Sequence, residues 1–360
     1  MNGENFILNL RKMKKIKFET DYQEGAHPKI LERLLATNLE QTSGYGVDAH
    51  NEHAKELIRR AINKPNAEIF FAVGGTQSNT IVIKSILDPC EGVVCVSSGH
   101  INVHESGAIE ATGHKILTLP HHNGLLDAED LKKYLTAFYA NPTYEHTVQP
   151  GMVYVSNSSE YGTVYTKNIL KNIKAVCEEY NLPLFVDGAR LGTALTSEAS
   201  DMDIKDLAEI CDIFYIGGTK NGALFGEAIV FTSPEKFRLK NFRTLIKQQG
   251  GLLAKGRLLG LQFEVLFEDG LYFENARHAN KQAMKIQKAF TDSKIPFLFE
   301  SFTNQQFPIL TAEQNKKLSA EFDYELWEPL EDNKMAVRFC TSWATSDENV
   351  EKLINAIKNL

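Results

Sequence analysis

The chain of 360 residues has no long apolar run, and it contains only 2 tryptophans and 5 cysteines. A membrane-spanning helix needs about 18 or more consecutive apolar residues. No window approaches that length, so we expect no membrane partner. The apolar stretch at residues 6–10 is shorter than the core of a secretion signal. We therefore expect no secretion, and residues 1–12 are interpreted as an extension or alternative start that adds nothing to the fold.

The chain contains few cysteines, and their spacing does not match a metal-binding motif. The five cysteines are Cys90, Cys95, Cys177, Cys211 and Cys340, and no two of them form a C-x-x-C pair. An odd number of widely spaced cysteines in a long chain is typical of reduced thiols in the cytosol. We therefore expect a cytoplasmic protein without a disulfide framework or a zinc site.

Basic residues are slightly outnumbered, with 39 Lys and Arg against 46 Asp and Glu, a net charge of −7. The sequence also lacks a long basic stripe, which argues against nucleic acid as the principal partner. Apolar residues make up 43% and charged residues 24%. These values are typical of a folded protein with a full core, and the length suggests about two domains.

Short apolar segments alternate with amphipathic ones between about residues 50 and 250. The strand candidates are residues 69–73, 93–97, 116–119, 152–156, 184–187, 213–217 and 228–232. The helix candidates between them include residues 51–63, 77–87, 127–138 and 167–180. Because the strand candidates are unbroken rather than alternating, we expect helices on both faces of the sheet. The pattern predicts an α/β fold with a mostly parallel seven-stranded sheet.

The pattern changes after residue 250. A long helical region at 252–293 precedes short strand candidates near 297–300, 307–310, 321–326 and 335–340, and a last helix at 347–359. We therefore predict a large domain at 14–255, with an N-terminal arm at 14–44, and a smaller α+β domain at 256–360. Ligands of such sheets bind where strands end at their carboxyl termini.

Three motifs follow predicted strands. Gly74-Gly-Thr76 follows the first, Asp187-Gly-Ala-Arg190 ends the fifth, and Gly217-Gly-Thr-Lys220 ends the sixth. Taken singly, each has a structural explanation: a threonine cap, a turn aspartate and a solvated lysine. Together they provide backbone amides for a phosphate, an acid and an amine. Pyridoxal phosphate requires this set, in which the lysine forms a Schiff base and the acid pairs with the pyridine nitrogen.

Several segments make the chain resemble the threonine aldolase / β-eliminating lyase family of fold-type I pyridoxal-phosphate enzymes. Val186-Asp-Gly-Ala-Arg190 matches a family signature, Gly74-Gly-Thr-Gln-Ser-Asn79 resembles its phosphate loop, and Thr219-Lys220 stands where the family has Ser-Lys. Tyr45-Gly46-x-Asp48 resembles a further family motif. The resemblance covers residues from about 20 to 338.

The resemblance implies roles for residues around the cofactor. Lys220 is the implied Schiff-base lysine and Asp187 the partner of the pyridine nitrogen. Gly75 and Thr76 would hold the phosphate, and His100 would stack on the cofactor ring. From spacing alone, His100 and His104 also allow a metal pair or a polar edge, but no third ligand is evident. We therefore expect no metal.

The resemblance also implies a substrate site. Arg338 would bind the substrate carboxylate, because a guanidinium can bond both carboxylate oxygens. Arg190 would lie beside the phenolic oxygen of the cofactor and the carboxylate, and Thr20 would touch the carboxylate as well. A lone arginine in a strand is otherwise often an exposed edge residue, so the role of Arg338 depends on the resemblance.

The chain departs from the family at two places. True threonine aldolases commonly have Glu-Asn-Thr-His where this chain has Asn157-Ser-Ser-Glu160, so Glu160, His104 or a water is the candidate base. Residues 249–256 lack the Arg-Gln pair that the family often has there. Lys255 could supply the positive charge instead, to the cofactor phosphate bound by a neighbouring subunit.

The leading hypothesis is an aldolase that cleaves a β-hydroxy-α-amino acid to glycine and an aldehyde. The changed Ser158-Ser159-Glu160 segment keeps other pyridoxal-phosphate reactions open, namely β-elimination, racemisation and amino transfer. A member of the fold that binds amino acids without turnover is a third hypothesis. A phosphate-binding hydrolase fits less well, because the chain lacks a Walker loop and a nucleophile elbow. The family also implies a homodimer or homotetramer with active sites at the dimer interface.

Overall fold

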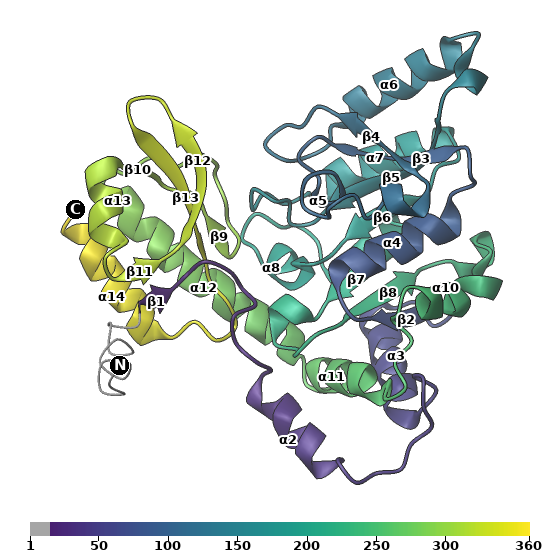
Figure 1. The fold of residues 1–360 in the computed structure, drawn as a ribbon, viewed down its shortest axis with the longest axis horizontal. Coiled ribbons are helices and arrows are strands. Elements are labelled where there is room, and N and C mark those ends of the chain that lie inside the picture. The colour runs from purple at the N-terminus through teal and green to yellow at the C-terminus, as the bar shows by residue number, and fades with distance from the viewer. Residues whose placement is uncertain (1–14) are drawn as a thin grey trace, which may run out of the picture.

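A computed structural model describes residues 15–360 of the chain. The expected extension over residues 1–12 lies outside these residues. Two sheets dominate the structure, a large one formed by the first two thirds of the chain and a small one near the C-terminus (Figure 1). In the described part of the chain, no helix has the length and apolar character needed to cross a membrane.

The large sheet has seven strands in the order β2-β8-β7-β6-β5-β3-β4. They are β2 (Glu68–Ala72), β3 (Glu91–Val96), β4 (Lys115–Leu119), β5 (Gln149–Ser156), β6 (Leu184–Asp187), β7 (Ile213–Gly217) and β8 (Glu227–Phe231). Strand β8 pairs antiparallel with both β2 and β7, and the other pairings are parallel. The predicted α/β architecture with a mostly parallel seven-stranded sheet is confirmed.

Helices cover both faces of this sheet (Figure 1). The helices of this part of the chain are α2 (Pro28–Ala36), α3 (Ala49–Ile62), α4 (Gly75–Ile86), α5 (His100–Val103), α6 (Ala128–Ala140), α7 (Lys167–Glu179), α8 (Leu191–Leu195), α9 (Ile204–Ile210), α10 (Phe242–Gln248) and α11 (Arg257–Glu268). Successive residues of one strand enter different cores: Val94 belongs to one buried cluster, and its neighbour Val93 belongs to another. Two buried faces explain why the strand segments are apolar at every position rather than at alternate ones.

The long helical region is interrupted. Helix α11 ends at Glu268, and α12 (Leu271–Asp292) begins after Gly270, whose φ of +74° lies in the left-handed region. The predicted single helical region is therefore two helices, because a glycine in that conformation redirects the chain. Helix α12 runs from the large sheet to the small one (Figure 1).

The small sheet has the order β10-β13-β12, and β9 also pairs with β13. Its elements are β9 (Gln305–Gln306), β10 (Ile309–Thr311), α13 (Ala312–Leu318), β11 (Phe322–Asp323), β12 (Glu325–Leu330), β13 (Lys334–Cys340) and α14 (Asp347–Lys358). The N-terminal β1 (Ile16–Lys17) pairs in parallel with β11. The expected strand at 297–300 is absent from the described structure; Phe297 makes only an isolated bridge with Pro308. The division at residue 255 stays a prediction.

Short 3-10 helices fill several connections: Glu110–Thr112, Tyr144–His146, Thr219–Asn221 (η3), Pro234–Lys236 and Leu239–Asn241. All five cysteines are free, and four are buried while Cys90 is exposed.

Helix α11 approaches α3 closely because Gly260 has no side chain. A Cβ atom at Gly260 would lie 2.5 Å from the Cα of Asn51 on α3. We predict that Gly260→Ala lowers the free energy of unfolding by about 2 kcal/mol, the usual cost of forcing atoms into a packed core. Urea denaturation measures it. The matched control is Gly25→Ala, where a Cβ would meet no atom within 4 Å; equal stability of the two variants would contradict the packing argument.

Candidate active site

The predicted site residues follow strands of the large sheet at one edge. Asp187 is the last residue of β6, and Lys220 lies in η3 directly after β7. Gly75 opens α4 after β2, and His100 opens α5 after β3. Because β2, β3, β6 and β7 run in the same direction, their carboxyl ends meet along this edge.

Asp187 is almost fully buried and accepts four hydrogen bonds. The hydroxyls of Tyr154 and Tyr215 donate to its two oxygens, Asn79 Nδ2 donates to Oδ2 at 3.0 Å, and the Ala189 amide donates to Oδ1 at 3.0 Å. Burial alone raises the pKa of a carboxyl group, but the nearby His100 and these hydrogen bonds outweigh burial and lower the pKa of Asp187. Asp187 is therefore an ionised carboxylate in a buried position.

A chain of side chains joins Asp187 to His100. Asn79 Nδ2 also donates to Glu105 Oε1 at 2.7 Å, and the same oxygen lies 2.8 Å from His100 Nδ1. The His104 ring follows at 5.5 Å between ring centroids. Asn79 belongs to the phosphate-loop segment that carries the family resemblance, but its connection to Glu105 crosses 26 residues and could not be inferred from spacing.

Lys220 makes no ion pair with a carboxylate among residues 15–360. Burial and the positive charge of Arg190 lower the pKa of its amine, against the opposing effect of Asp21, Asp187 and Glu227. A lower pKa increases the neutral fraction of the amine, which is the nucleophilic form.

Arg190 is bound by Asp21, a residue of the N-terminal arm that the sequence interpretation did not assign. Arg190 Nε donates to Asp21 Oδ2 at 2.7 Å and Nη2 donates to Oδ1 at 3.1 Å. Asn304 Nδ2 also donates to Asp21 Oδ2, at 2.9 Å. Burial raises the pKa of Asp21, but Arg190, Lys220 and Asn304 together lower it to about 2. Two of the guanidinium nitrogens of Arg190 are thus occupied by protein.

Arg338 lies on β13 of the small sheet. Its Nη1 donates to Gln305 Oε1 at 3.0 Å, Nη2 donates to the Glu19 carbonyl at 3.2 Å, and Nη2 also forms an ion pair with Glu325. The guanidinium lies 5.5 Å from the centre of the Trp327 ring. Glu325 stands opposite Arg338 in the β12–β13 pairing. Arg338 is therefore a mostly buried cation rather than the exposed edge residue that a lone strand arginine suggests.

Glu160 follows β5 and contacts the helix that carries His100. Its Oε1 accepts from the His100 amide and from Ser156 Oγ, both at 2.9 Å, and its buried Oε2 has no hydrogen-bond partner. Burial raises the pKa of Glu160, opposed by Ser156 and by His100. An open cavity of about 280 Å³ borders Glu160, His104 and Trp327.

The phosphate-loop candidate is the N-terminus of the 12-residue helix α4. No side chain caps its first amides, and the first turn contains no acidic residue, which leaves the positive end of the helix available to an anion. A Cβ at Gly75 would lie 2.9 Å from the Tyr215 hydroxyl. This loop therefore packs against one of the tyrosines that donate a hydrogen bond to Asp187. Thr76 is the exposed second residue of the helix, and Lys255 is exposed in the turn before α11.

Buried polar atoms without partners gather around these residues. Four of these atoms lie near the edge of the large sheet: Asn79 Oδ1, Glu105 Oε2, Ser158 Oγ and Glu160 Oε2. Three others lie near the small sheet: Thr20 Oγ1, Gln305 Nε2 and Arg338 Nε. Buried polar groups are normally satisfied, so these atoms indicate a bound polar molecule. An anion-binding helix terminus, an ionised acid and an amine fit pyridoxal phosphate.

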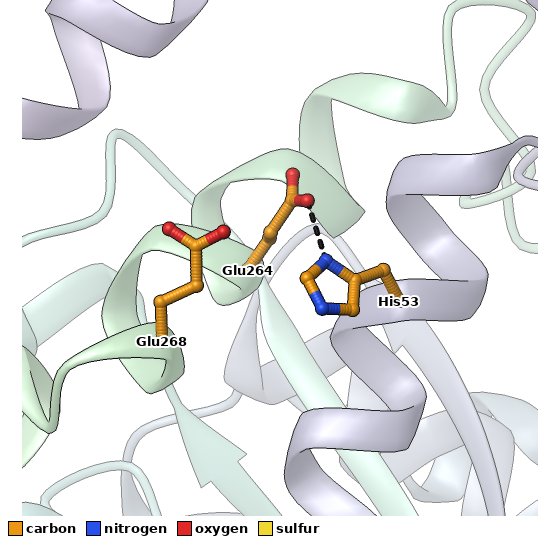
Figure 2. A group of neighbouring side chains, drawn as sticks. All are labelled: His53, Glu264 and Glu268. Carbon is orange, nitrogen blue, oxygen red and sulfur yellow. Dashed lines mark hydrogen bonds and ion pairs between the residues drawn. The ribbon is translucent and has the colours of Figure 1, made fainter.

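A separate group of ionisable residues joins α3 to α11, away from this edge. His53 Nδ1 lies 2.7 Å from Glu264 Oε1, and Glu268 is one turn further along α11 (Figure 2). The three side chains are close enough to share an ion, but Arg33 already pairs with both glutamates, at 3.6 Å and 2.8 Å. His50 Nδ1 contacts Glu264 as well, at 2.7 Å. The His50 side chain is only 14% exposed.

Several known proteins resemble this chain in sequence and in fold. The sequence model of the β-eliminating lyase family matches residues 17–313. A low-specificity L-threonine aldolase from Pseudomonas is 28% identical over 351 residues, which cover 95% of this chain and 97% of that protein. The structure of a threonine aldolase from Leishmania major is 43% identical, with a TM-score of 0.92 over 96% of this chain and 99% of that one.

Solved structures with much lower sequence identity share the fold. An aspartate aminotransferase from Thermus thermophilus has a TM-score of 0.71 at 16% identity and covers 99% of this chain and 94% of its own. This likeness concerns the fold alone and confirms the expected fold-type I architecture. The chain belongs to the β-eliminating lyase family of pyridoxal-phosphate-dependent enzymes.

Proposed function

We propose that this protein is a pyridoxal-phosphate-dependent aldolase that cleaves a β-hydroxy-α-amino acid, of the L-threonine or L-allo-threonine type, to glycine and an aldehyde. The observation that carries the proposal is the buried, ionised Asp187 on the same sheet edge as Lys220. The threonine aldolases similar to this chain over almost their whole length support the reaction type.

The cofactor, when bound, supplies a ring that accepts electrons from the bond being broken. Lys220 is the amine that would hold it covalently, and Asp187 would pair with its ring nitrogen. The first amides of α4, at Gly75 and Thr76, would hold the phosphate. His100, whose Nδ1 is fixed by Glu105, would cover the ring.

The substrate carboxylate would lie between the two sheets. Arg338 offers a mostly buried guanidinium whose Nε has no partner, and Thr20 Oγ1 is likewise unpartnered. Arg190 would add positive charge beside them, held in place by Asp21. Fixing the carboxylate and the amine orients the bond between Cα and Cβ, which is the contribution that these residues make to the rate.

The proton of the β-hydroxyl would go to Glu160. Its Oε1 is fixed by two hydrogen bonds, which leaves the unpartnered Oε2 as the proton acceptor. His104 borders the same cavity, but burial and the charge of His100 lower its pKa. A carboxylate with a raised pKa is a stronger base than an ordinary glutamate.

We also propose a cytoplasmic homodimer or homotetramer, in which Lys255 contacts the phosphate bound by a neighbouring subunit. Apolar side chains are exposed along the segment from α2 to the turn before α3: Leu31, Leu35, Leu39, Tyr45 and Val47. Exposed apolar patches of this kind usually mark interfaces. The five free cysteines support the compartment.

The reaction is tested with the purified protein, pyridoxal phosphate and L-threonine or L-allo-threonine. We expect glycine and acetaldehyde in equal amounts, and we expect Lys220→Ala to lose both the cleavage and the visible absorbance of the bound cofactor. Lys171→Ala, an exposed lysine on α7, is the matched control and should keep the absorbance. Ammonia and 2-oxobutanoate in place of glycine and acetaldehyde would show that the reaction is an elimination and refute the aldolase.

The base is tested with Glu160→Gln, which keeps a hydrogen-bond acceptor for Ser156 and for the His100 amide. We expect kcat to fall by about 100-fold, the usual contribution of a general base, with the cofactor absorbance unchanged. Because a base must be ionised and burial raises the pKa of Glu160, the wild-type rate should decline on acidification at a higher pH than an ordinary glutamate gives.

His104→Asn is the companion variant and should cleave at a rate within about threefold of wild type. A large loss in His104→Asn together with a small loss in Glu160→Gln would identify the histidine as the base.

The subunit interface is tested by Leu35→Glu, because Leu35 is 80% exposed in the chain alone. A charge there should weaken association, and sedimentation velocity should show a smaller species at micromolar concentration. Leu326→Glu, another exposed apolar position, on β12, is the control. An unchanged mass for Leu35→Glu would exclude this segment as the interface.

A further inference from the structure

The cavity that borders Glu160 is lined by aromatic rings. Tyr161 lines it from the loop after β5, and Trp327 lines it from β12 of the small sheet. These two rings are nearly perpendicular, at 83°, with their centres 6.2 Å apart. The His121 ring, which follows β4, is also nearly perpendicular to Tyr161, with centres 5.2 Å apart. Three segments that are distant in sequence therefore contribute rings to one cavity.

The orientation of Tyr161 is fixed by the segment that leads into the small sheet. Phe299 stacks on its ring, with the ring centres 4.0 Å apart and the planes within 5° of parallel. The hydroxyls of Ser301 and Thr303 both donate to the Gly162 carbonyl at 3.1 Å. The ring and the residue that follows it are thus both held by the same segment, and the cavity has a preformed side.

Trp327 owes its position to an irregularity in the β12–β13 pairing. Leu326 stands opposite Val337 and Glu328 stands opposite Ala336, which leaves Trp327 as an extra residue without a partner. A bulge of this kind redirects a side chain and is common beside active sites. The pairing therefore sets Trp327 apart from its neighbours on the same strand.

Trp327 also connects the two groups that we propose to hold the substrate. Its ring centre lies 5.5 Å from the guanidinium carbon of Arg338, and it borders the same cavity as Glu160. An amino acid whose carboxylate is bound by Arg338 and whose β-hydroxyl faces Glu160 would lie along this indole. The remaining substituent on Cβ is then the group that enters the cavity beside Tyr161 and Trp327.

We propose that Tyr161 and Trp327 are specificity-determining residues, which favour β-hydroxy-α-amino acids with an aromatic ring on Cβ over threonine. The cavity volume of about 280 Å³ is close to the lower size of pockets for whole small molecules, about 300 Å³. A methyl group would leave most of this space to water. A third ring can contact one of two perpendicular rings by its face and the other by its edge, as aromatic groups prefer. The inference rests on the proposed function and adds to it the class of substrate.

The first test measures binding without turnover, in the protein with pyridoxal phosphate bound. L-Phenylalanine and L-2-aminobutyrate lack the β-hydroxyl, so an aldolase cannot cleave them, and they carry the ring and the methyl group to be compared. Isothermal titration calorimetry should give a dissociation constant at least about tenfold lower for L-phenylalanine, within the discrimination that an apolar pocket achieves. Equal affinity for the two amino acids would overturn the inference.

L-Cyclohexylalanine separates aromatic character from size. Its ring fills a similar volume without a π-system, and it should bind about threefold more weakly than L-phenylalanine, the usual contribution of an aromatic pair beyond its buried area. Affinity equal to that of L-phenylalanine would show that the cavity selects by size alone and would overturn the aromatic preference.

Two variants test the rings themselves. Trp327→Leu and Tyr161→Leu each replace a ring with an apolar side chain, and each should reduce the preference for L-phenylalanine over L-2-aminobutyrate to about threefold or less. The ratio is the readout, because a weaker contact between Arg338 and the carboxylate would raise both dissociation constants equally. Trp327→Phe restores a ring and should keep most of the preference. Leu326→Ala, at the exposed neighbouring position on β12, is the matched control and should keep the wild-type ratio, whereas that ratio in Trp327→Leu would overturn the role of Trp327.

Cleavage should follow the same order. We expect kcat/KM for L-β-phenylserine, measured as benzaldehyde, to exceed that for L-threonine, measured as acetaldehyde, by about tenfold. A higher kcat/KM for L-threonine would contradict the inference. If neither amino acid is cleaved while the order of binding holds, the aldolase proposal fails and the preference of the cavity stands, so the two failures are distinguishable.

Discussion

The site depends on keeping one carboxylate ionised inside the protein. A buried aspartate ordinarily gains a proton, because burial disfavours the charged form. Asp187 resists this through hydrogen bonds from two tyrosines, an asparagine and a backbone amide, which come from β5, β7, α4 and the turn after β6. Each donor stands on a different element. The ionised state of Asp187 therefore depends on the positions of these strands and of α4.

The same donors also contact other residues that we propose to bind the cofactor. Tyr215 lies against Gly75 of the phosphate loop, and Asn79 continues to Glu105 and His100. A hydrogen-bonded path therefore links Asp187 to Glu105 and His100. Two arginines are held by carboxylates: Arg190 is fixed by Asp21, and Arg338, on the small sheet, pairs with Glu325. The net charge of −7 says little about the site, where Arg190, Lys220 and Arg338 are local cations.

Features that depend on local sequence could be predicted. Residues 184–187 and 213–217 are strands as expected, because their runs of apolar residues end at a polar or glycine-rich turn. The family resemblance also identified Asp187 and Lys220 as candidates before their surroundings were known. In the small sheet the prediction was weaker. Residues 297–300 have an apolar composition but make only one bridge, since β9 and β10 pair with β13 instead.

Features that depend on contacts between distant residues could not be predicted. Asp21 and Arg190 are 169 positions apart, and nothing in either segment indicates the ion pair. Glu227 looks like the start of an ordinary strand, and only the antiparallel pairing of β7 with β8 brings it to the lysine turn. The roles of all the site residues, from Lys220 and Asp187 to Glu160 and Lys255, remain proposals, because they concern ligands rather than the chain itself.

The central claim is that ionised Asp187 holds the cofactor, and a binding titration tests it most directly. Pyridoxal phosphate is added to the cofactor-free protein and to Asp187→Asn, and the visible absorbance is followed to saturation, with circular dichroism as a check of folding. The account predicts one cofactor per wild-type chain and binding at least about tenfold weaker in the folded variant, equivalent to about 1.4 kcal/mol. Equal affinity and an unchanged spectrum in Asp187→Asn would contradict it.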